Sequence, residues 1–190
     1  MRGSVFISDL HLAPDTPDIA LRLRSCLAQR CAGADALYIL GDLFEFWVGD
    51  DQLEDPFPAG IAADLRRLAD AGTRICIMHG NRDFLLGPDF MTAAGAELLP
   101  DPSIVDLYGT RTLLVHGDSL CTDDHAYLAY RQQVRDPDWQ RQFFTKPLAE
   151  RLAIAHEYRA RSKAAQSGAA MTISDEIGRA SCRERVSVVV

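Results

Sequence analysis

Four short β-rich runs in this chain are each followed by polar side chains of the types that bind metal ions. The four clusters read SDLH, GDLFEFW, HGNRD and HGDSL. Carboxylate and amide oxygens together with imidazole nitrogens form a ligand set that suits Mn²⁺, Fe or Zn²⁺ better than Ca²⁺. The candidate metal ligands are Asp9, His11, Asp42, Asn81 and His116.

The elements before these clusters must bring them together. The β-rich runs are residues 4–8, 36–40, 74–78 and 112–115, and helical apolar spacing occurs at 19–31 and 61–71. This alternation predicts an α/β fold with parallel strand pairing. Ligand sites in such sheets lie beyond the carboxyl ends of the strands, so the four clusters should converge. Asp9 and His11 should face the same way if the chain there is extended.

Each cluster has an ordinary structural explanation when it is taken alone. An aspartate at a strand end often caps a turn or helix, and Gly-Asp or Gly-Asn is common in turns. Arg82 could form a surface ion pair with Asp83, while Asp83 is expected to orient a histidine or the loop, and His79 is expected to be structural. Four such clusters in order, each after a predicted strand, favour a metal site over four unrelated turns.

Composition bounds the class of protein. The chain has 190 residues, of which 47% are hydrophobic and 25% charged, a mixture typical of a globular domain. No apolar run approaches the roughly 20 residues of a membrane-spanning helix. Its five cysteines form no CxxC pair, which favours reduced thiols and a cytoplasmic location.

Charge is distributed unevenly along the chain, whose net charge is −7. Residues 1–122 hold 9 arginines and 18 acidic residues, a balance of −9, whereas residues 123–163 hold 8 basic and 6 acidic residues, a balance of +2. The acidic first part argues against a nucleic-acid partner and suits cations. The basic second part favours an anionic substrate or membrane surface.

The pattern also predicts the domain organisation. Residues 1–120 should form the core, and residues 121–170 should form a helical cap, broken into about three helices near residues 136–138 and 146–147 by prolines. Residues 171–190 are expected to be a tail of foreign origin. Aromatic and aliphatic residues of the cap could line an apolar chamber or simply form the cap's own core: Trp139, Phe143, Phe144, Leu148, Leu152 and Ile154.

The blocks DLH, GDLFEFW, GNRD and HGD resemble the metal-binding blocks of the calcineurin-like metallophosphoesterases. Within that family, GNRD and HGDSLCTDDHAY resemble the corresponding blocks of the bacterial enzymes that hydrolyse UDP-2,3-diacylglucosamine in lipid A biosynthesis. The resemblance implies a layered β-sheet sandwich flanked by helices, with an inserted helical cap, and two Mn²⁺ ions per subunit. It assigns Asp9, His11 and Asp42 to the first ion, and Asp42, Asn81 and His116 to the second.

The resemblance further implies cleavage of the diphosphate to UMP and 2,3-diacylglucosamine 1-phosphate, at the cytoplasmic face of the inner membrane. Arg82 would act as the catalytic cation, and the implied substrate-binding residues are Asn81, Arg82, Asp124, Ser162 and Gln166. Two positions depart from the family's Ser-x-x-x-Asn-x-x-Lys pattern, because Gln166 replaces the asparagine and Ala169 the lysine.

One block of the superfamily, Gly-His-x-His, is absent, since no histidine follows His156. The expectation is therefore that each ion lacks one imidazole, that the last strands are missing and that this chain alone is poorly active. Two alternatives remain. One is another metallophosphoesterase that acts on nucleotides or phosphoproteins, and the other is a scaffold that binds metal without catalysis.

Overall fold

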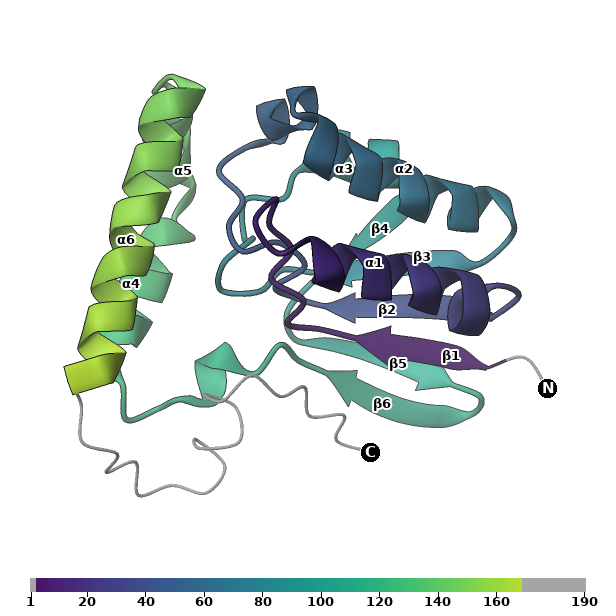
Figure 1. Ribbon diagram of the computed structural model, residues 1–190. Helices are drawn as coiled ribbons and strands as arrows, with labels where there is room; N and C mark the ends of the chain where they lie inside the picture. The colour runs from purple at the N-terminus through teal and green to yellow at the C-terminus, as the bar shows by residue number, and fades with distance from the viewer. Residues whose placement is uncertain (1–2, 169–190) are drawn as a thin grey trace. The chain divides into compact units, whose positions relative to one another are not determined.

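The computed structural model describes residues 3–168 and divides into two compact units, with the boundary between His116 and Gly117. The first unit contains a parallel sheet of four strands in the order β1-β2-β3-β4 (Figure 1). Its strands are β1 (Ser4–Ile7), β2 (Ala36–Leu40), β3 (Arg74–Met78) and β4 (Ala96–Leu99). The α/β class and the parallel pairing predicted from the sequence are confirmed.

Proline opens each α-helix of the first unit, and the side chain of Asp55 also caps the second of these helices. They are α1 (Pro17–Cys26), which continues into a π-helix at Leu27–Cys31, α2 (Pro56–Asp70) and α3 (Pro88–Ala94). Each has proline in its first turn, where the missing N–H costs no hydrogen bond. Figure 1 shows α1 and α2 on one face of the sheet, and Arg24 joins them through a 2.7 Å contact with Asp64.

The opposite face of the sheet packs against an antiparallel hairpin of β5 (Ser103–Leu107) and β6 (Thr110–Leu114). A core cluster joins Tyr38, Met78 and Leu114, with Val105 and Leu107 packed beside it. The predicted run at 112–115 therefore belongs to a separate two-stranded sheet and not to the parallel sheet. Its end nevertheless leads to His116, within the first unit.

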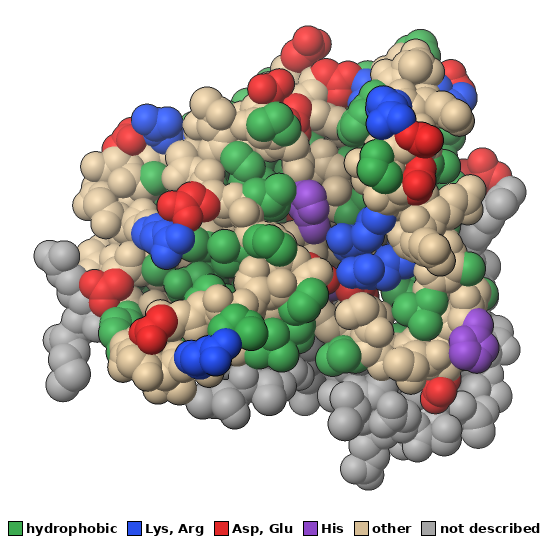
Figure 2. All heavy atoms as spheres, turned by 180° about the vertical axis from the view of Figure 1, so that it is seen from behind, with side chains coloured by type: hydrophobic (Ala, Val, Ile, Leu, Met, Phe, Trp, Pro, Cys, Tyr) green, Lys and Arg blue, Asp and Glu red, His purple; other side chains and the backbone are tan. Residues whose placement is uncertain are grey.

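The outward side of this hairpin is less well covered. Figure 2 shows hydrophobic side chains at the surface of the face seen from behind. Ile104 and Leu113, which are partners across β5 and β6, are 61% and 38% exposed. The hairpin therefore uses only its inward residues to complete the core.

The second unit contains three α-helices within its described part, as the proline positions predicted: α4 (His125–Val134), α5 (Pro137–Phe144) and α6 (Leu148–Gly168). The side chain of Asp136 caps α5 by accepting hydrogen bonds from the N–H groups of Asp138 and Trp139. Trp139 stacks on the buried Phe143 with ring centroids 4.9 Å apart. These two aromatic residues thus contribute to the unit's own packing.

None of the helices among the described residues is both long and apolar enough to cross a bilayer. Cys26, Cys31 and Cys76 are free thiols, as expected. The predicted tail, residues 171–190, lies outside the described part of the chain.

Candidate metal centre

Three of the predicted ligands lie in left-handed backbone conformation. Asp9, His11 and Asp42 have φ angles of 53°, 49° and 53°. Non-glycine residues adopt this conformation rarely, and such positions cluster at functional sites. The expectation that Asp9 and His11 share a direction because the chain is extended was therefore wrong in its reason: β1 ends at Ile7, and both residues lie in the loop beyond it.

Backbone hydrogen bonds hold the loops after β1 and β2 side by side. The N–H of Asp9 donates to the carbonyl oxygen of Gly41 at 3.1 Å, and the N–H of His11 donates to that of Asp42 at 3.0 Å. Because buried backbone groups need partners, these bonds fix the left-handed turns instead of leaving them strained and mobile. These bonds join the two loops and thereby set the spacing of their side chains.

Glycine is required where the loops after β2 and β3 meet. A Cβ atom on Gly80 would collide with the carboxylate and the backbone nitrogen of Asp42. One on Gly41, whose φ is 96°, would lie 2.5 Å from Nδ1 of His116 and 2.7 Å from Cα of Gly80. Only glycine permits this approach of the two loops.

Asp83 joins the same two loops from inside the protein. Its side chain is fully buried, and its carboxylate accepts hydrogen bonds from the N–H groups of Leu43 at 2.7 Å, Gly80 at 2.8 Å and Asp42 at 3.2 Å. Three backbone donors satisfy the buried charge without a metal ion. Asp83 therefore orients the loop, as the sequence predicted, and forms no surface ion pair with Arg82.

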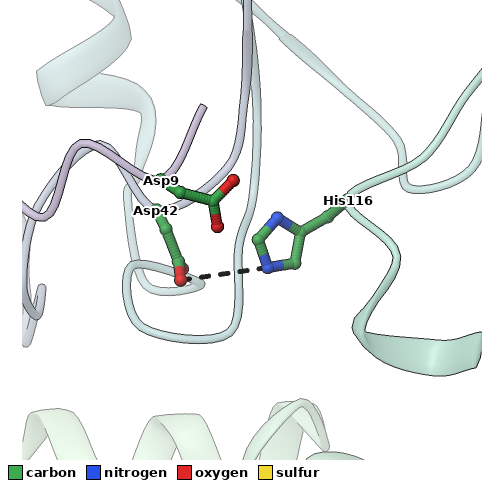
Figure 3. Close-up of side chains that lie close together, drawn as sticks. All are labelled: Asp9, Asp42 and His116. Carbon is green, nitrogen blue, oxygen red and sulfur yellow. Dashed lines mark ion pairs between the residues drawn. The ribbon is translucent and has the colours of Figure 1, made fainter. Parts of the chain in front are cut away.

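The side chains of Asp9, Asp42 and His116 point toward one another (Figure 3). One ligand atom from each lies within 4.8 Å of the others. Nδ1 of His116 lies 2.9 Å from the carbonyl oxygen of Leu40, which leaves Nε2 directed to Asp42, 3.9 Å from its Oδ2. An imidazole fixed through one nitrogen by a backbone carbonyl is the usual arrangement of a metal-binding histidine.

The other two predicted ligands lie around the same carboxylate. Nδ1 of His11 is 3.8 Å from Oδ2 of Asp42, and Oδ1 of Asn81 is 3.4 Å from Nε2 of His116. The amide of Asn81 can donate to both oxygens of Asp42, at 2.6 and 3.1 Å, when its nitrogen faces them. In the opposite orientation the amide oxygen faces the carboxylate of Asp42. Both groups are then acceptors, so this orientation is favourable only when a cation lies between them.

The electrostatics of Asp42 also fit a cation. Its side chain is nearly fully buried, and burial followed by repulsion from Asp83 raises its pKa to about 7, although His116 and Arg82 act in the opposite direction. A divalent ion would favour the ionised carboxylate and reverse this rise. The donor set and the charge of the site therefore fit divalent metal binding.

One residue of the site was missed by sequence reasoning. Glu45 places Oε2 2.6 Å from Nη1 of Arg82 and 3.8 Å from Nδ1 of His11. In the sequence it lies within the aromatic run Phe44–Trp47, a pattern that is typical of residues packed in a core. Its separation of 37 residues from Arg82 gave no local signal of the contact.

The remaining predicted substrate-binding residues belong to the second unit. The side chain of Asp124 accepts a hydrogen bond from the N–H of Tyr127 at 2.9 Å and caps α4. Ser162 and Gln166 lie on α6, and their side chains are not among those described. Ala169 lies outside the described residues. Their substrate contacts remain predictions.

With this geometry in place, comparison with known proteins defines the class. A model of the calcineurin-like phosphoesterase family matches residues 4–180, and the chain belongs to that family. It is 49% identical over 173 residues to a UDP-2,3-diacylglucosamine hydrolase of Cellvibrio japonicus, covering 91% of this chain and 72% of that protein. It is 51% identical over 166 residues to a protein of the same name from Stenotrophomonas maltophilia, covering 86% and 66%.

Among solved structures, the chain is similar to the Pseudomonas putida nuclease MPE, with a TM-score of 0.39 and 17% identity over 54% of this chain and 50% of that one. The chain spans 72% of the length of the Cellvibrio japonicus protein and 66% of the length of the Stenotrophomonas maltophilia protein.

Proposed function

We propose that the chain hydrolyses the diphosphate of UDP-2,3-diacylglucosamine to UMP and 2,3-diacylglucosamine 1-phosphate, with two Mn²⁺ ions as cofactors. The observation that carries this proposal is the cluster of Asp9, Asp42 and His116 at the ends of three separate strands, with Arg82 beside it. The names of relatives about half identical to this chain support the choice of substrate.

The chain's own residues divide the work. Asp9, His11 and Asp42 would hold one ion, and Asp42, Asn81 and His116 the other. Divalent cations there would supply activation of water and Lewis-acid stabilisation of the phosphate oxygens.

Arg82 is suited to the diphosphate because its planar guanidinium stays charged and matches phosphate oxygens in pairs. Its side chain is only 17% exposed, so its interaction with an anion is weakly screened by water. No protein nucleophile is required in this scheme.

For the second unit we propose recognition of the lipid part of the substrate at the cytoplasmic face of the inner membrane. Phe144 is 45% exposed although it neighbours the buried Phe143, so α5 presents apolar surface as well as core. Asp124, Ser162 and Gln166 are the residues proposed to bind the headgroup. The excess of basic residues between 123 and 163 would favour an anionic surface.

The test is UMP release from UDP-2,3-diacylglucosamine by the purified chain with and without Mn²⁺. Because the sequence predicts a reduced rate, the chain is used in excess over substrate, so that a single turnover is detected. UDP-N-acetylglucosamine and an aryl phosphate serve as competing substrates, and Asp42→Asn serves as the inactive control.

We expect Mn²⁺-dependent UMP release that Asp42→Asn abolishes, with at least tenfold preference for the acylated substrate, since buried apolar contacts of one or two methylene groups already supply that factor. Equal cleavage of the aryl phosphate would indicate a general phosphoesterase. Mn²⁺ binding without any cleavage would indicate a scaffold that retains only the metal site.

A further inference from the structure

Glu45, in the loop after β2, lies where that loop meets the loops after β1 and β3. Its backbone N–H donates to the carbonyl oxygen of Leu12 at 3.1 Å, which attaches it to the loop after β1. Its carboxylate reaches Nη1 of Arg82, in the loop after β3, at 2.6 Å. The two side chains are 28% and 17% exposed, so this ion pair is considerably less hydrated than one on the open surface.

Arg82 has a second carboxylate within reach, and the two differ in what they can do. Its Nε is 3.6 Å from Oδ2 of Asp42, and its backbone N–H donates to Oδ1 of Asp42 at 2.9 Å. Asp42 is a proposed metal ligand, so a cation there would take up its charge and repel the guanidinium. Glu45 would then be the carboxylate of the pair that still attracts Arg82.

From this geometry we propose that Glu45 is a positioning residue for Arg82: it holds the guanidinium through Nη1 beside the metal ligands, where a phosphate group bound at the metal centre would meet it. This inference rests on the proposed function and deepens it, because it names the group that keeps the phosphate-binding arginine in place. An arginine held in advance loses less conformational freedom when the anion binds.

The first test follows Arg82 itself in the metal-free chain and needs no activity. Phenylglyoxal labels accessible guanidinium groups, and peptide mass spectrometry gives the labelling rate of each arginine. Glu45→Gln should raise the rate at Arg82 at least about threefold, because the charged partner is lost.

Glu97→Gln is the matched control, since Oε2 of Glu97 forms a 2.6 Å pair with Arg74 at the opposite end of β3. It removes the same charge and should leave Arg82 labelling unchanged. Unchanged labelling of Arg82 in Glu45→Gln would overturn the proposal.

The second test separates positioning from a purely structural role by a double-mutant cycle on UMP affinity in saturating Mn²⁺. Glu45→Gln should weaken UMP binding about tenfold in the parent chain and cause no further loss in the Arg82→Ala background, because its effect passes through Arg82. An equal loss in both backgrounds would overturn the proposal.

The contact with His11 makes a metal measurement necessary. Mn²⁺ affinity, followed by electron paramagnetic resonance, should change less than about threefold in Glu45→Gln, whereas loss of a group that orients a metal ligand typically costs 10- to 100-fold. A loss in that range would assign Glu45 to the metal ligands instead of Arg82. If UDP-2,3-diacylglucosamine were not cleaved while the UMP cycle behaved as expected, the proposed substrate would fail and the positioning role would stand.

Discussion

Two of the Gly-Asp pairs in this chain, Gly41-Asp42 and Gly117-Asp118, are alike in sequence and burial but opposite in surroundings. Both carboxylates are buried, with 2% and 7% of each residue exposed. Asp118, in the second unit, accepts from the hydroxyl of Tyr127 and from Nε of Arg131 at 2.8 Å, and Arg135 lies 3.9 Å away. Asp42 has its nearest guanidinium nitrogen at 3.6 Å and repels a second buried carboxylate, that of Asp83.

The difference separates an anchor from a binding site. Side-chain cations contact Asp118 directly, and its charge, after burial, raises the pKa of Tyr127, which keeps that hydroxyl a donor. The carboxylate then ties α4 to the chain that precedes it. At Asp42 the pKa is raised to about 7, and the surrounding groups are further potential ligands. A buried carboxylate whose neighbours leave it short of positive charge is suited to receive an ion.

The largest effect should come from neutralising the two aspartates in turn. Asp42→Asn should lower Mn²⁺ affinity at least about 100-fold, because it removes a charged ligand that the proposal shares between two ions. Asp118→Asn should change it less than about twofold. Titration of both variants with Mn²⁺, followed by electron paramagnetic resonance, checks the contrast. Similar losses in the two variants would remove the distinction between anchor and site.

A smaller loss is expected from Asp83→Asn. The amide retains one acceptor for the three N–H groups of Asp42, Leu43 and Gly80, and turns an NH₂ group toward another of them. The ligand loops should shift, and Mn²⁺ affinity should fall by about 10- to 100-fold, as for other groups that support metal ligands. Isothermal titration with Mn²⁺ measures this. Asp89→Asn, at an exposed position of α3, is the control and should bind Mn²⁺ as the parent chain does.

The sequence predicted the scaffold better than the details of the centre. β2 and β3 stand out as uninterrupted apolar runs because both faces of the parallel sheet are covered. β4 and β5 were not predicted, since half or more of their residues are only partly buried and their apolar pattern is short. The end of α1 continues as a π-helix, which no residue pattern distinguishes from an α-helix.

Within the site, convergence followed from the fold, whereas conformation did not. Strand ends on one edge of a sheet must approach one another, so the meeting of Asp9 and Asp42 was predictable. The left-handed turns at these residues depend on hydrogen bonds between two loops that lie about 30 residues apart in the sequence. Local conformational propensity does not predict such long-range bonds. Glu45 was missed for the same reason. The division of ligands between two ions came from family resemblance and not from spacing.

The raised pKa of Asp42 predicts an unusual dependence of stability on pH. The pKa is about 7 in the folded, metal-free chain against 3.8 for an ordinary aspartate, so the unfolded chain binds fewer protons between these values. Stability should therefore fall as the pH rises from about 4 to about 7, by up to about 1 kcal/mol per pH unit, and this contribution should not change further above pH 7. Urea unfolding of the metal-free chain, compared with Asp42→Asn at each pH, isolates this group. A difference between the two proteins that is independent of pH would contradict it.

The smallest expected change concerns the anchor. Asp118→Asn keeps one acceptor but removes the charge that faces Tyr127 and Arg131, at a cost of about 2 kcal/mol, the scale of a hydrogen bond to a charged group. Hydrogen exchange of the α4 amides should accelerate accordingly, while amides of β2 and β3 keep their protection. Asp138→Asn is the matched control, because its pair with Arg141 is exposed on both sides and should contribute little. Equal acceleration of hydrogen exchange in the two variants would mean that Asp118 stabilises the second unit no more than a surface carboxylate does. The difference between Asp118 and Asp42 would then consist of metal binding alone.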